Sequence, residues 1–425
     1  MRTHPIMYYI PHTPSDLKIM FKRLGINNID ELFESIPPSI LNPEIDLPNG
    51  TDMIHVQNHM EEVYSQSKAH TLNSFLGAGA YDHFIPPVIS YLVSRGEFLT
   101  SYTPYQPEMS QGLLQAIFEY QTMICQLTGA DVSNASLYDG STALWEAVLM
   151  ASRINRRRKV LIVDPLNPLY RDVLETHLQG AEISYQHIKA PQLNINKDAL
   201  LAQLDDTISS VVLQYPNFLG TAEDLQSIAQ ACQQIGALLV VTANPLALSM
   251  FKSPMHMGCD IIVGEGQPLG IPLSYGGPYF GYIATHQKYV RQLPGRICGE
   301  SVDAEQKKAY VLTLQAREQH IRREKATSNI CTNQSLLALR ASIYMAYMGL
   351  EGMRTVATAS HKRIAYLKSL LEPLEDIQVI SQNNMYCEIV LELPLPTQEV
   401  KELALKHNIE LGYDLIEYNP EWKNR

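Results

Sequence analysis

Long hydrophobic runs, paired cysteines and an excess of positive charge are all missing from this 425-residue sequence. No apolar run approaches the ~20 residues that a membrane-spanning helix needs. The N-terminal segment MRTHPIMYYIPHTPSD is too polar and too often interrupted by proline for a signal peptide. The six cysteines are scattered without paired spacing, as is typical of free thiols in a reducing cytoplasm. With a net charge of −11, neither nucleic acid nor an anionic membrane is expected as a partner. These absences predict a cytoplasmic protein.

Two further absences concern chemistry. His256 and Cys259 are one isolated pair of possible metal ligands, and without a second pair no tetrahedral metal site is expected. Lysine is missing from residues 253–287, although Lys252 and Lys288 stand directly on either side. A lysine amine is the nucleophile that forms a Schiff base. The segment 253–287 therefore cannot form one.

Residues 1–70 are predicted to form a helical arm. Ser15 can cap a first helix that ends at Gly25, and its apolar residues fall on one face. A second short helix is expected over residues 29–36, followed by a link rich in proline and glycine over residues 43–50. Such an arm either wraps a neighbouring subunit or packs on its own chain, and the sequence leaves both open.

Residues 71–300 alternate between helical and strand patterns. Four short apolar runs are typical of buried parallel strands: residues 160–163, 210–213, 238–241 and 261–263. Helical patterns surround and separate them, at residues 110–128, from 141 onward, at 169–178 and at 222–235. The alternation predicts an α/β domain with a doubly wound, mainly parallel sheet and ligands at the carboxyl ends of its strands.

Residues 301–425 are predicted to begin with a long helix-rich stretch through Met348 and to continue as a small α+β domain. Helices are expected at residues 362–371 and 397–407, and strands at 377–380 and 385–391. No strand or helix pattern follows Tyr418. The small domain is therefore expected to lack its last elements.

A glycine and two hydroxyl residues begin the helix that follows residue 139, in the order Asp139, Gly140, Ser141, Thr142. A helix N-terminus offers free backbone N–H groups and the positive end of the helix dipole, which suit a phosphate. The same residues also suit an ordinary helix cap by Asp139 or Ser141. Both interpretations remain open at the level of sequence.

Residues 100–108 form an aromatic loop that is stiffened by proline. Tyr102 and Tyr105 would be presented with little conformational entropy to lose, and Gln106 and Glu108 follow them directly. Such a loop suits a substrate pocket or an interface. A purely structural turn before the next helix is the alternative.

A second polar segment joins a charged run to a dense group of small polar residues. The charged run is typical of a solvated helix face. The group after it favours a functional or interface loop, because Ser, Thr and Asn compete with the backbone hydrogen bonds of a helix. The residues that we assign to this loop are Arg322, Arg323, Lys325, Ser328, Asn329, Thr332 and Asn333.

Three segments, FLTSYTPYQPEMSQG, DIIVGEGQPLGIPLSYGGPY and IRREKATSNICTNQ, closely resemble the glycine cleavage system P-protein family, and the resemblance covers nearly the whole chain. Within that family the sequence is most similar to the alpha subunit (subunit 1) of the two-subunit glycine dehydrogenase (decarboxylating). The resemblance implies a fold-type-I scaffold of the pyridoxal-phosphate (PLP) enzymes. It also implies a partner, subunit 2, that carries PLP, with glycine as substrate and the lipoyl arm of H-protein as acceptor of the aminomethyl group.

The resemblance also locates a degenerate cofactor pocket. Gln267 and Pro268 stand where the family's PLP lysine belongs, and neither can form a Schiff base. Thr242 and Asn244 stand where an aspartate usually pairs with the pyridinium nitrogen of PLP, and neither carries a charge. The segment beginning at Asp139 cannot be taken as a working phosphate site merely because PLP enzymes have one there. The chain is interpreted as a non-catalytic copy that completes its partner's active site.

By analogy with the family, Tyr102, Tyr105, Gln106 and Glu108 are expected near the subunit interface, where they would orient substrate and exclude water. Two other functions remain open. The chain could be a structural scaffold for subunit 2, or an autonomous PLP enzyme that uses a lysine just outside the lysine-free segment.

Overall fold

The computed structural model describes residues 11–41, 46–48, 50–382, 384–420 and 422. The chain divides into two compact units, residues 1–70 and 71–425. In the described ranges no helix is both long and apolar enough to cross a membrane. The same residues contain no group of three or more His, Cys, Asp or Glu side chains that could hold a metal ion.

Helix α1 (Pro14–Leu24) of the first unit is capped by Thr13, so the expected cap at Ser15 is wrong. Thr13 Oγ1 accepts the Asp16 backbone N–H at 3.3 Å, and the Asp16 carboxylate accepts the Thr13 N–H at 2.8 Å. This reciprocal pair satisfies two N–H groups, which a cap at Ser15 would not do. The helix ends at Gly25, as predicted, in the left-handed conformation that glycine adopts at low cost.

The remainder of the first unit differs from the prediction. The second helix is a 3₁₀ turn, η1 (Ile29–Phe33), shorter than the expected range of 29–36. The predicted link at 43–50 lies partly outside the described residues. A further helix, α2 (Met53–Gln66), was not predicted. Large apolar side chains of this unit are left exposed by its helices, and its residues 11–41, 46–48 and 50–70 include no buried apolar side chain.

The second unit is built around a seven-stranded sheet with the order β2-β8-β7-β6-β5-β3-β4. Strands β4, β3, β5, β6 and β7 run parallel, and β8 and β2 add antiparallel pairs at one edge. The strand bounds are β2 (Val132–Ser133), β3 (Lys159–Val163), β4 (Ser184–Ile188), β5 (Ile208–Tyr215), β6 (Leu238–Ala243), β7 (Ile261–Glu265) and β8 (Gly281–Thr285). The predicted mainly parallel α/β fold is confirmed, and its four predicted strands are β3, β5, β6 and β7.

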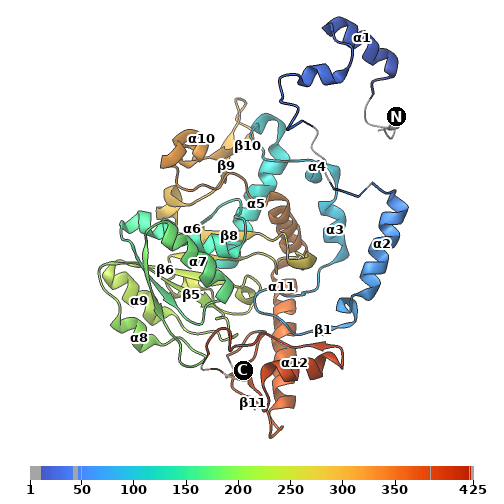
Figure 1. The fold of residues 1–425 in the computed structure, drawn as a ribbon. Helices are drawn as coiled ribbons and strands as arrows, with labels where there is room; N and C mark the ends of the chain where they lie inside the picture. Colours follow the sequence, from blue (N-terminus) through green and yellow to red (C-terminus); the bar gives the residue numbers. More distant parts are fainter. Residues whose placement is uncertain (1–10, 42–45, 49, 383, 421, 423–425) are drawn as a thin grey trace. The chain divides into compact units, whose positions relative to one another are not determined.

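Helices cover both faces of the sheet (Figure 1). Successive side chains of a strand point to opposite faces, so Leu161 and Val163 of β3 join one core while Val160 and Ile162 join the other. The first core includes side chains of α3 (Pro87–Val93), α5 (Gln111–Thr128), α9 (Gln226–Ile235) and α11 (Ser335–Leu371). The second includes α6 (Gly140–Asn155) and α7 (Pro168–Gly180). The result is a three-layer α/β/α arrangement.

Strands β4 and β8 were not predicted from the sequence. Strand β4 lies at the edge of the sheet and has the polar sequence SYQHI, so it lacks the apolar run of a buried strand. Strand β8 begins at Gly281 and carries the mixed sequence GYIAT, although all five of its residues are buried. Both strands form because they pair with neighbouring strands, and the local sequence pattern does not predict such pairing.

The helix-rich stretch expected from residue 301 through Met348 is confirmed by α11 from Ser335 onward, but it is wrong at its start. A β-hairpin forms there instead, from β9 (Ile297–Val302) and β10 (Lys308–Thr313), followed by the short helix α10 (Gln319–Arg322). Tyr310 and Leu312 alternate with less buried neighbours and pack beside Leu114 of α5. This period of two is the signal of a half-buried strand.

The small C-terminal elements have little sheet of their own. The expected strand at 385–391 is largely wrong, because of these residues only Leu391 lies in a strand, β12 (Leu391–Glu392). This short strand pairs with β11 (Gln378–Val379). Met385 instead bridges to Thr221. Helix α12 (Thr397–Leu405) is followed by β13 (Ile409–Glu410), which pairs in parallel with β1 (Asn73–Ser74). These elements therefore form two short two-stranded sheets, and β13 and Met385 pair with residues of the α/β domain.

The segment that ends the described chain packs firmly. The Tyr418 ring stacks between Phe218 and Trp422 at centroid distances of 5.5 and 5.7 Å. Its hydroxyl accepts the Leu166 backbone N–H at 3.2 Å. Two residues without a helix or strand pattern thus belong to a local hydrophobic core.

Candidate functional site

The carboxyl end of β7 meets the first residue of α6. Glu265 is the last residue of β7, and its Oε2 accepts the Gly140 backbone N–H at 3.0 Å. The carboxyl edge of a parallel sheet, next to a helix N-terminus, is where α/β proteins bind ligands. Here a side chain of the chain itself takes that position.

The N-terminus of α6 is closed by its own cap. Asp139 Oδ1 accepts the Thr142 backbone N–H at 2.8 Å and the Ser141 hydroxyl at 2.6 Å. Thr142 Oγ1 in turn accepts the Asp139 N–H at 3.2 Å. Of the two interpretations that the sequence left open, the structure shows the helix cap. The Thr142 N–H and the Ser141 hydroxyl, which could otherwise receive a phosphate, are already in use.

Glu265 collects three backbone donors. Besides the Gly140 N–H, its carboxylate accepts the N–H groups of Gln267 and Phe280, each at 3.2 Å. The pKa of Glu265 is raised from its ordinary 4.5 to about 7, chiefly by burial and in part by the nearby charge of Asp139, while the three hydrogen bonds oppose the rise. A carboxyl with this set of donors is a fixed part of the pocket.

Gln267, at the position expected for the cofactor lysine, is 2 % exposed and fully engaged. Its Oε1 accepts the Tyr81 backbone N–H at 3.2 Å, and its Nε2 donates to the Tyr81 carbonyl at 2.9 Å. Nε2 also donates to the Ile271 carbonyl at 2.7 Å. Pro268 beside it is buried. The side-chain amide of Gln267 therefore pairs with the backbone of Tyr81 in the way that a backbone peptide group would.

The second expected anchor also lacks charge. Thr242 is buried in β6, which extends two residues beyond the predicted end at 241. Asn244 Oδ1 accepts the backbone N–H groups of Leu246 and Ala247 at 3.0 and 3.3 Å, so it closes a turn. Neither residue supplies a carboxylate that could pair with a pyridinium nitrogen.

The two flanking lysines lie at the surface. Lys252 and Lys288 are both exposed, and the Lys288 amine lies 4.6 Å from the centroid of the adjacent Tyr289 ring. A Schiff-base lysine needs a desolvated amine inside the pocket. With Gln267 and Glu265 in place as well, the residues of this pocket do not fit PLP.

The predicted tyrosine loop projects into solvent. Tyr102 is 70 % exposed and Tyr105 is 56 % exposed, and Gln106 and Glu108 are exposed as well. Large aromatic side chains at such exposure are common at protein interfaces. The structure thus brings these four side chains together on one accessible loop.

The predicted polar loop divides into an exposed part and a bonded part. Its cations Arg322, Arg323 and Lys325 are exposed, as is Asn329, whereas Thr332 is half-buried. The other two predicted residues hold the loop onto α6 and the segment before it. Asn333 Nδ2 donates to the Ala135 carbonyl at 3.0 Å and to the Ser136 hydroxyl at 2.8 Å, and the Ser328 hydroxyl donates to Glu146 Oε1 at 2.8 Å.

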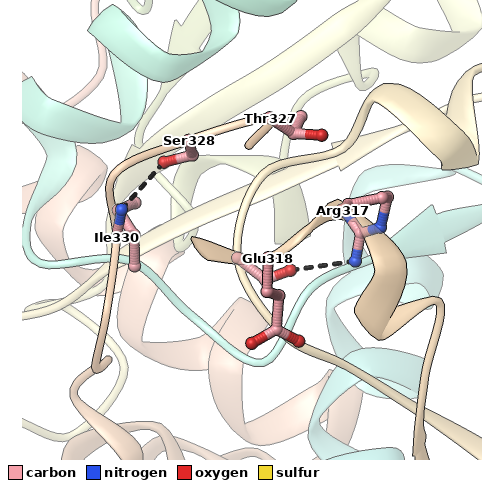
Figure 2. A pocket seen from close by; sticks show the side chains of 6 residues that line it. Arg317, Glu318, Thr327, Ser328 and Ile330 are labelled. Carbon is pink, nitrogen blue, oxygen red and sulfur yellow. Dashed lines mark hydrogen bonds between the residues drawn. The ribbon is translucent and has the colours of Figure 1, made fainter. Parts of the chain in front are cut away.

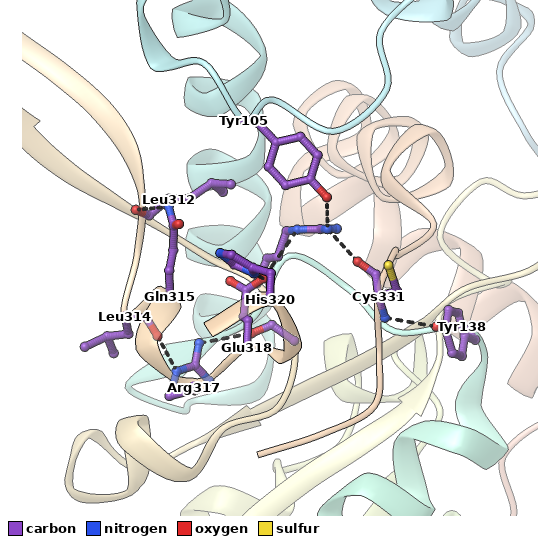
Figure 3. A network of polar contacts seen from close by, with 11 residues as sticks. Tyr105, Tyr138, Leu312, Leu314, Gln315, Arg317, Glu318, His320 and Cys331 are labelled. Carbon is purple, nitrogen blue, oxygen red and sulfur yellow. Dashed lines mark hydrogen bonds and ion pairs between the residues drawn. The ribbon is translucent and has the colours of Figure 1, made fainter. Parts of the chain in front are cut away.

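Arg296 joins the two loops, and the sequence interpretation missed it. It is 6 % exposed. Its Nη2 donates to the Tyr105 hydroxyl at 2.7 Å and also to the Cys331 carbonyl, while its guanidinium lies 5.2 Å from the centroid of the Tyr105 ring. Figure 3 shows this network between Tyr105 and Cys331, with Glu318 beside it at 3.8 Å from Arg296 Nε. One buried cation therefore sets the position of both loops.

A small pocket lies beneath the polar loop (Figure 2). It has room for about one water molecule. Its walls are held by short-range hydrogen bonds, among them Arg317 Nη2 to the Gly295 carbonyl at 3.0 Å and the Ile330 N–H to the Ser328 hydroxyl at 3.1 Å. A space of this size cannot receive an amino acid. The hydrogen bonds around it hold the polar loop in place.

The comparisons with known proteins decide the family. The model of the family described as "Glycine cleavage system P-protein" matches residues 7–421. This chain belongs to that family.

Relatives of this P-protein chain are similar along almost their whole length. A protein of Desulforamulus reducens named "Probable glycine dehydrogenase (decarboxylating) subunit 1" is 48% identical over 98% of this chain and 94% of its own. A protein of Geotalea daltonii with the same name is 46% identical, over 97% of this chain and 93% of its own.

Solved structures give the same picture. A crystal structure described as glycine decarboxylase (P-protein) of the glycine cleavage system, in inhibitor-bound form, has a TM-score of 0.88 and 42% identity, covering 95% of this chain and 91% of that chain. A glutamate decarboxylase of Lactobacillus brevis has a TM-score of 0.65 at 14% identity, covering 87% of this chain and 85% of that one, and shows the fold alone. The expected fold-type-I PLP-enzyme scaffold is confirmed.

One prediction concerns how the polar loop of this P-protein is held. Burial raises the pKa of Glu146 to about 7, while its bond from Ser328 opposes the rise. Since the folded-state pKa exceeds the unfolded 4.5, the contribution to stability is fully present below about pH 4.5 and is lost as the pH rises to about 7. Glu146 should contribute a fall in unfolding free energy of up to about 3 kcal/mol over this range, measured by urea unfolding at several pH values.

Glu146→Gln keeps an acceptor for Ser328 and removes the titration, so its unfolding free energy should fall less steeply with pH. Glu119→Gln is the control, because Glu119 is exposed on α5 and carries the same charge. Equal slopes for the Glu146 variant and the unaltered chain would contradict this role.

Proposed function

We propose that this chain is subunit 1 of a two-subunit glycine dehydrogenase (decarboxylating) and acts only together with subunit 2. The observation that carries the proposal is a retained PLP-enzyme fold whose own cofactor pocket is filled by Gln267 and Glu265. The names of the relatives support it, since "subunit 1" implies a second subunit. PLP, when bound to subunit 2, would supply the electron sink for decarboxylation of glycine.

The two loops that Arg296 joins are the surface that we assign to subunit 2. Tyr102 and Tyr105 would cover the partner's active site, orient glycine and exclude water, and Gln106 and Glu108 would add hydrogen bonds at its edge. Two observations support this: the loops are accessible, and their bases are held by buried contacts. Pre-organised aromatic side chains lose little entropy on binding. The exposed Arg322, Arg323 and Lys325 would contact the partner or the lipoylated H-protein.

Reconstitution tests the proposed function directly. This chain, subunit 2 and their mixture would each be assayed with PLP for H-protein-dependent exchange of CO₂ with the carboxyl group of glycine. We expect activity only in the mixture, with PLP reduced by borohydride onto subunit 2. Activity of this chain alone, or borohydride fixation of PLP onto it in one-to-one ratio, would establish the autonomous enzyme instead.

Replacing both Tyr102 and Tyr105 by alanine should lower turnover of the mixture by about 10- to 100-fold, because the partner's site would lose its cover and its orientation of substrate. Tyr366→Ala is the matched control, since Tyr366 is 65% exposed on α11, outside both loops. Turnover would be compared at equal amounts of assembled complex, verified by size-exclusion chromatography. Full turnover of the double variant would favour the scaffold function.

A further inference from the structure

The anion position at the N-terminus of α6 is occupied by a carboxylate that the chain supplies itself. From this geometry we propose that Glu265 is an internal occupant of the phosphate position, and that it makes this chain exclude phosphorylated ligands, PLP included. Missing lysine alone would prevent a Schiff base but would leave a phosphate site intact. The proposal concerns binding by this chain alone and does not depend on the proposed function.

Five donors around the first turn of α6 and the end of β7 are already paired with carboxylates of the chain. Glu265 takes the Gly140 N–H, which is the first N–H of α6, together with the N–H groups of Gln267 and Phe280. Asp139 takes the Thr142 N–H and the Ser141 hydroxyl. A phosphate would have to displace a carboxylate with three hydrogen bonds, and it would find the Thr142 N–H and the Ser141 hydroxyl already paired.

The charge at this position is also wrong for a phosphate. A helix N-terminus carries about half a positive charge. Two carboxyl groups, Asp139 and Glu265, already face it, and a phosphate ester would add roughly two further negative charges. The mutual influence of the two carboxyl groups is visible in Glu265, whose pKa is raised in part by the charge of Asp139. Electrostatic repulsion therefore acts in the same direction as the lost donors.

Space is restricted as well. A methyl group at Gly140 would overlap the Tyr170 hydroxyl and lie 2.8 Å from the backbone nitrogen of Glu265. At Gly266, a methyl group would overlap the Phe280 ring. Gly140 thus lies in close contact with Tyr170 and the end of β7, and Gly266 with Phe280.

A second set of hydrogen bonds joins Gln267 and Glu388 to residues 78–81. Gln267 binds the Tyr81 backbone through both its amide atoms. Glu388 Oε1 accepts the Tyr81 hydroxyl at 2.9 Å and the Ala78 N–H at 3.0 Å, which fixes the same segment from the opposite end of the chain. Three distant parts of the sequence thus meet around Tyr81.

The test is a binding titration of the full-length chain at pH 8, where Glu265 is ionised. Inorganic phosphate and pyridoxine 5′-phosphate are the probes, because the latter lacks the aldehyde that would react with surface lysines. Binding would be measured as the ligand-dependent rise in the unfolding midpoint at constant ionic strength. Glu265→Ala opens the position, and Glu119→Ala removes the same charge from the exposed surface of α5.

We expect Glu265→Ala to bind phosphate about ten-fold more tightly than the unaltered chain, and Glu119→Ala to match the unaltered chain. If Glu265→Ala does not fold, Glu265→Gln keeps the volume without the charge and takes its place, with any gain in phosphate affinity supporting the proposal. Equal affinity of the unaltered chain and the folded variant would overturn it, as would tight binding of either probe by the unaltered chain.

Discussion

Replacing Gly281 by alanine is expected to destabilise the protein by about 3 kcal/mol or more, at the upper end of what overpacking costs. A methyl group there would overlap the Asp139 carbonyl oxygen and lie 2.6 Å from its carbonyl carbon. Neither backbone can move away easily. Gly281 exchanges two hydrogen bonds with Leu137, at 2.8 and 3.1 Å, which tie β8 to the segment that leads into α6.

This loss would be a large part of the free energy of unfolding of a typical domain, which is about 5–15 kcal/mol. It would be measured by urea unfolding at 25 °C. Gly112→Ala is the control, because Gly112 lies exposed on α5 and a methyl group there would meet no atom within 4 Å. That variant should gain about 0.5–1 kcal/mol from helix propensity. If Gly281→Ala stayed within 1 kcal/mol of the unaltered chain, α6 and β8 would have to be far less rigid than the geometry shows.

Replacing Arg296 by methionine should have the largest effect on activity. The substitution leaves the Tyr105 hydroxyl, the Cys331 carbonyl and the Glu318 carboxylate without their shared cation. Removing one partner from a buried charged network typically costs about 3–5 kcal/mol. Because both loops lose their common anchor, we also expect turnover of the reconstituted complex to fall by about 100-fold or more.

Arg296→Lys separates charge from geometry. Lysine keeps the charge but cannot reach several acceptors with a planar fork, so it should recover stability better than turnover. Arg363→Met, at an exposed position of α11, is the control for the loss of a positive charge. Unfolding free energy and the separate values of kcat and KM would be measured for each variant. Turnover that survives in a folded Arg296→Met complex would show that the loops do not serve the partner's active site.

The central strands could be predicted, and the lysine-free segment could be recognised, because both signals are local. Continuous apolar runs at β3, β5, β6 and β7 have one stable outcome, burial between two helical layers. Gln267 stands within a distinctive segment, so the loss of the amine was visible without coordinates. The tyrosine loop was identified in the same way, from aromatic residues between prolines.

The hairpin of β9 and β10 could not be predicted as readily. Its strands carry charged residues such as Glu300 and Lys308, and a helical pattern follows in α11, so the local signal is mixed. Pairing across the hairpin and packing of Tyr310 against Phe118 of α5, with ring centroids 5.3 Å apart, decide the outcome. Such contacts override intrinsic propensity.

By itself, the sequence determined the class of fold, the family resemblance and the absence of lysine from residues 253–287, since each depends on residue types and their spacing. Only the tertiary structure decided which side chain lies at the N-terminus of α6 and which side chain holds the two loops. Glu265 reaches Gly140 across 125 positions, and Arg296 reaches Tyr105 across 191. A buried charge can sit only where distant donors and acceptors converge on it, and the path of the folded chain alone determines that meeting point.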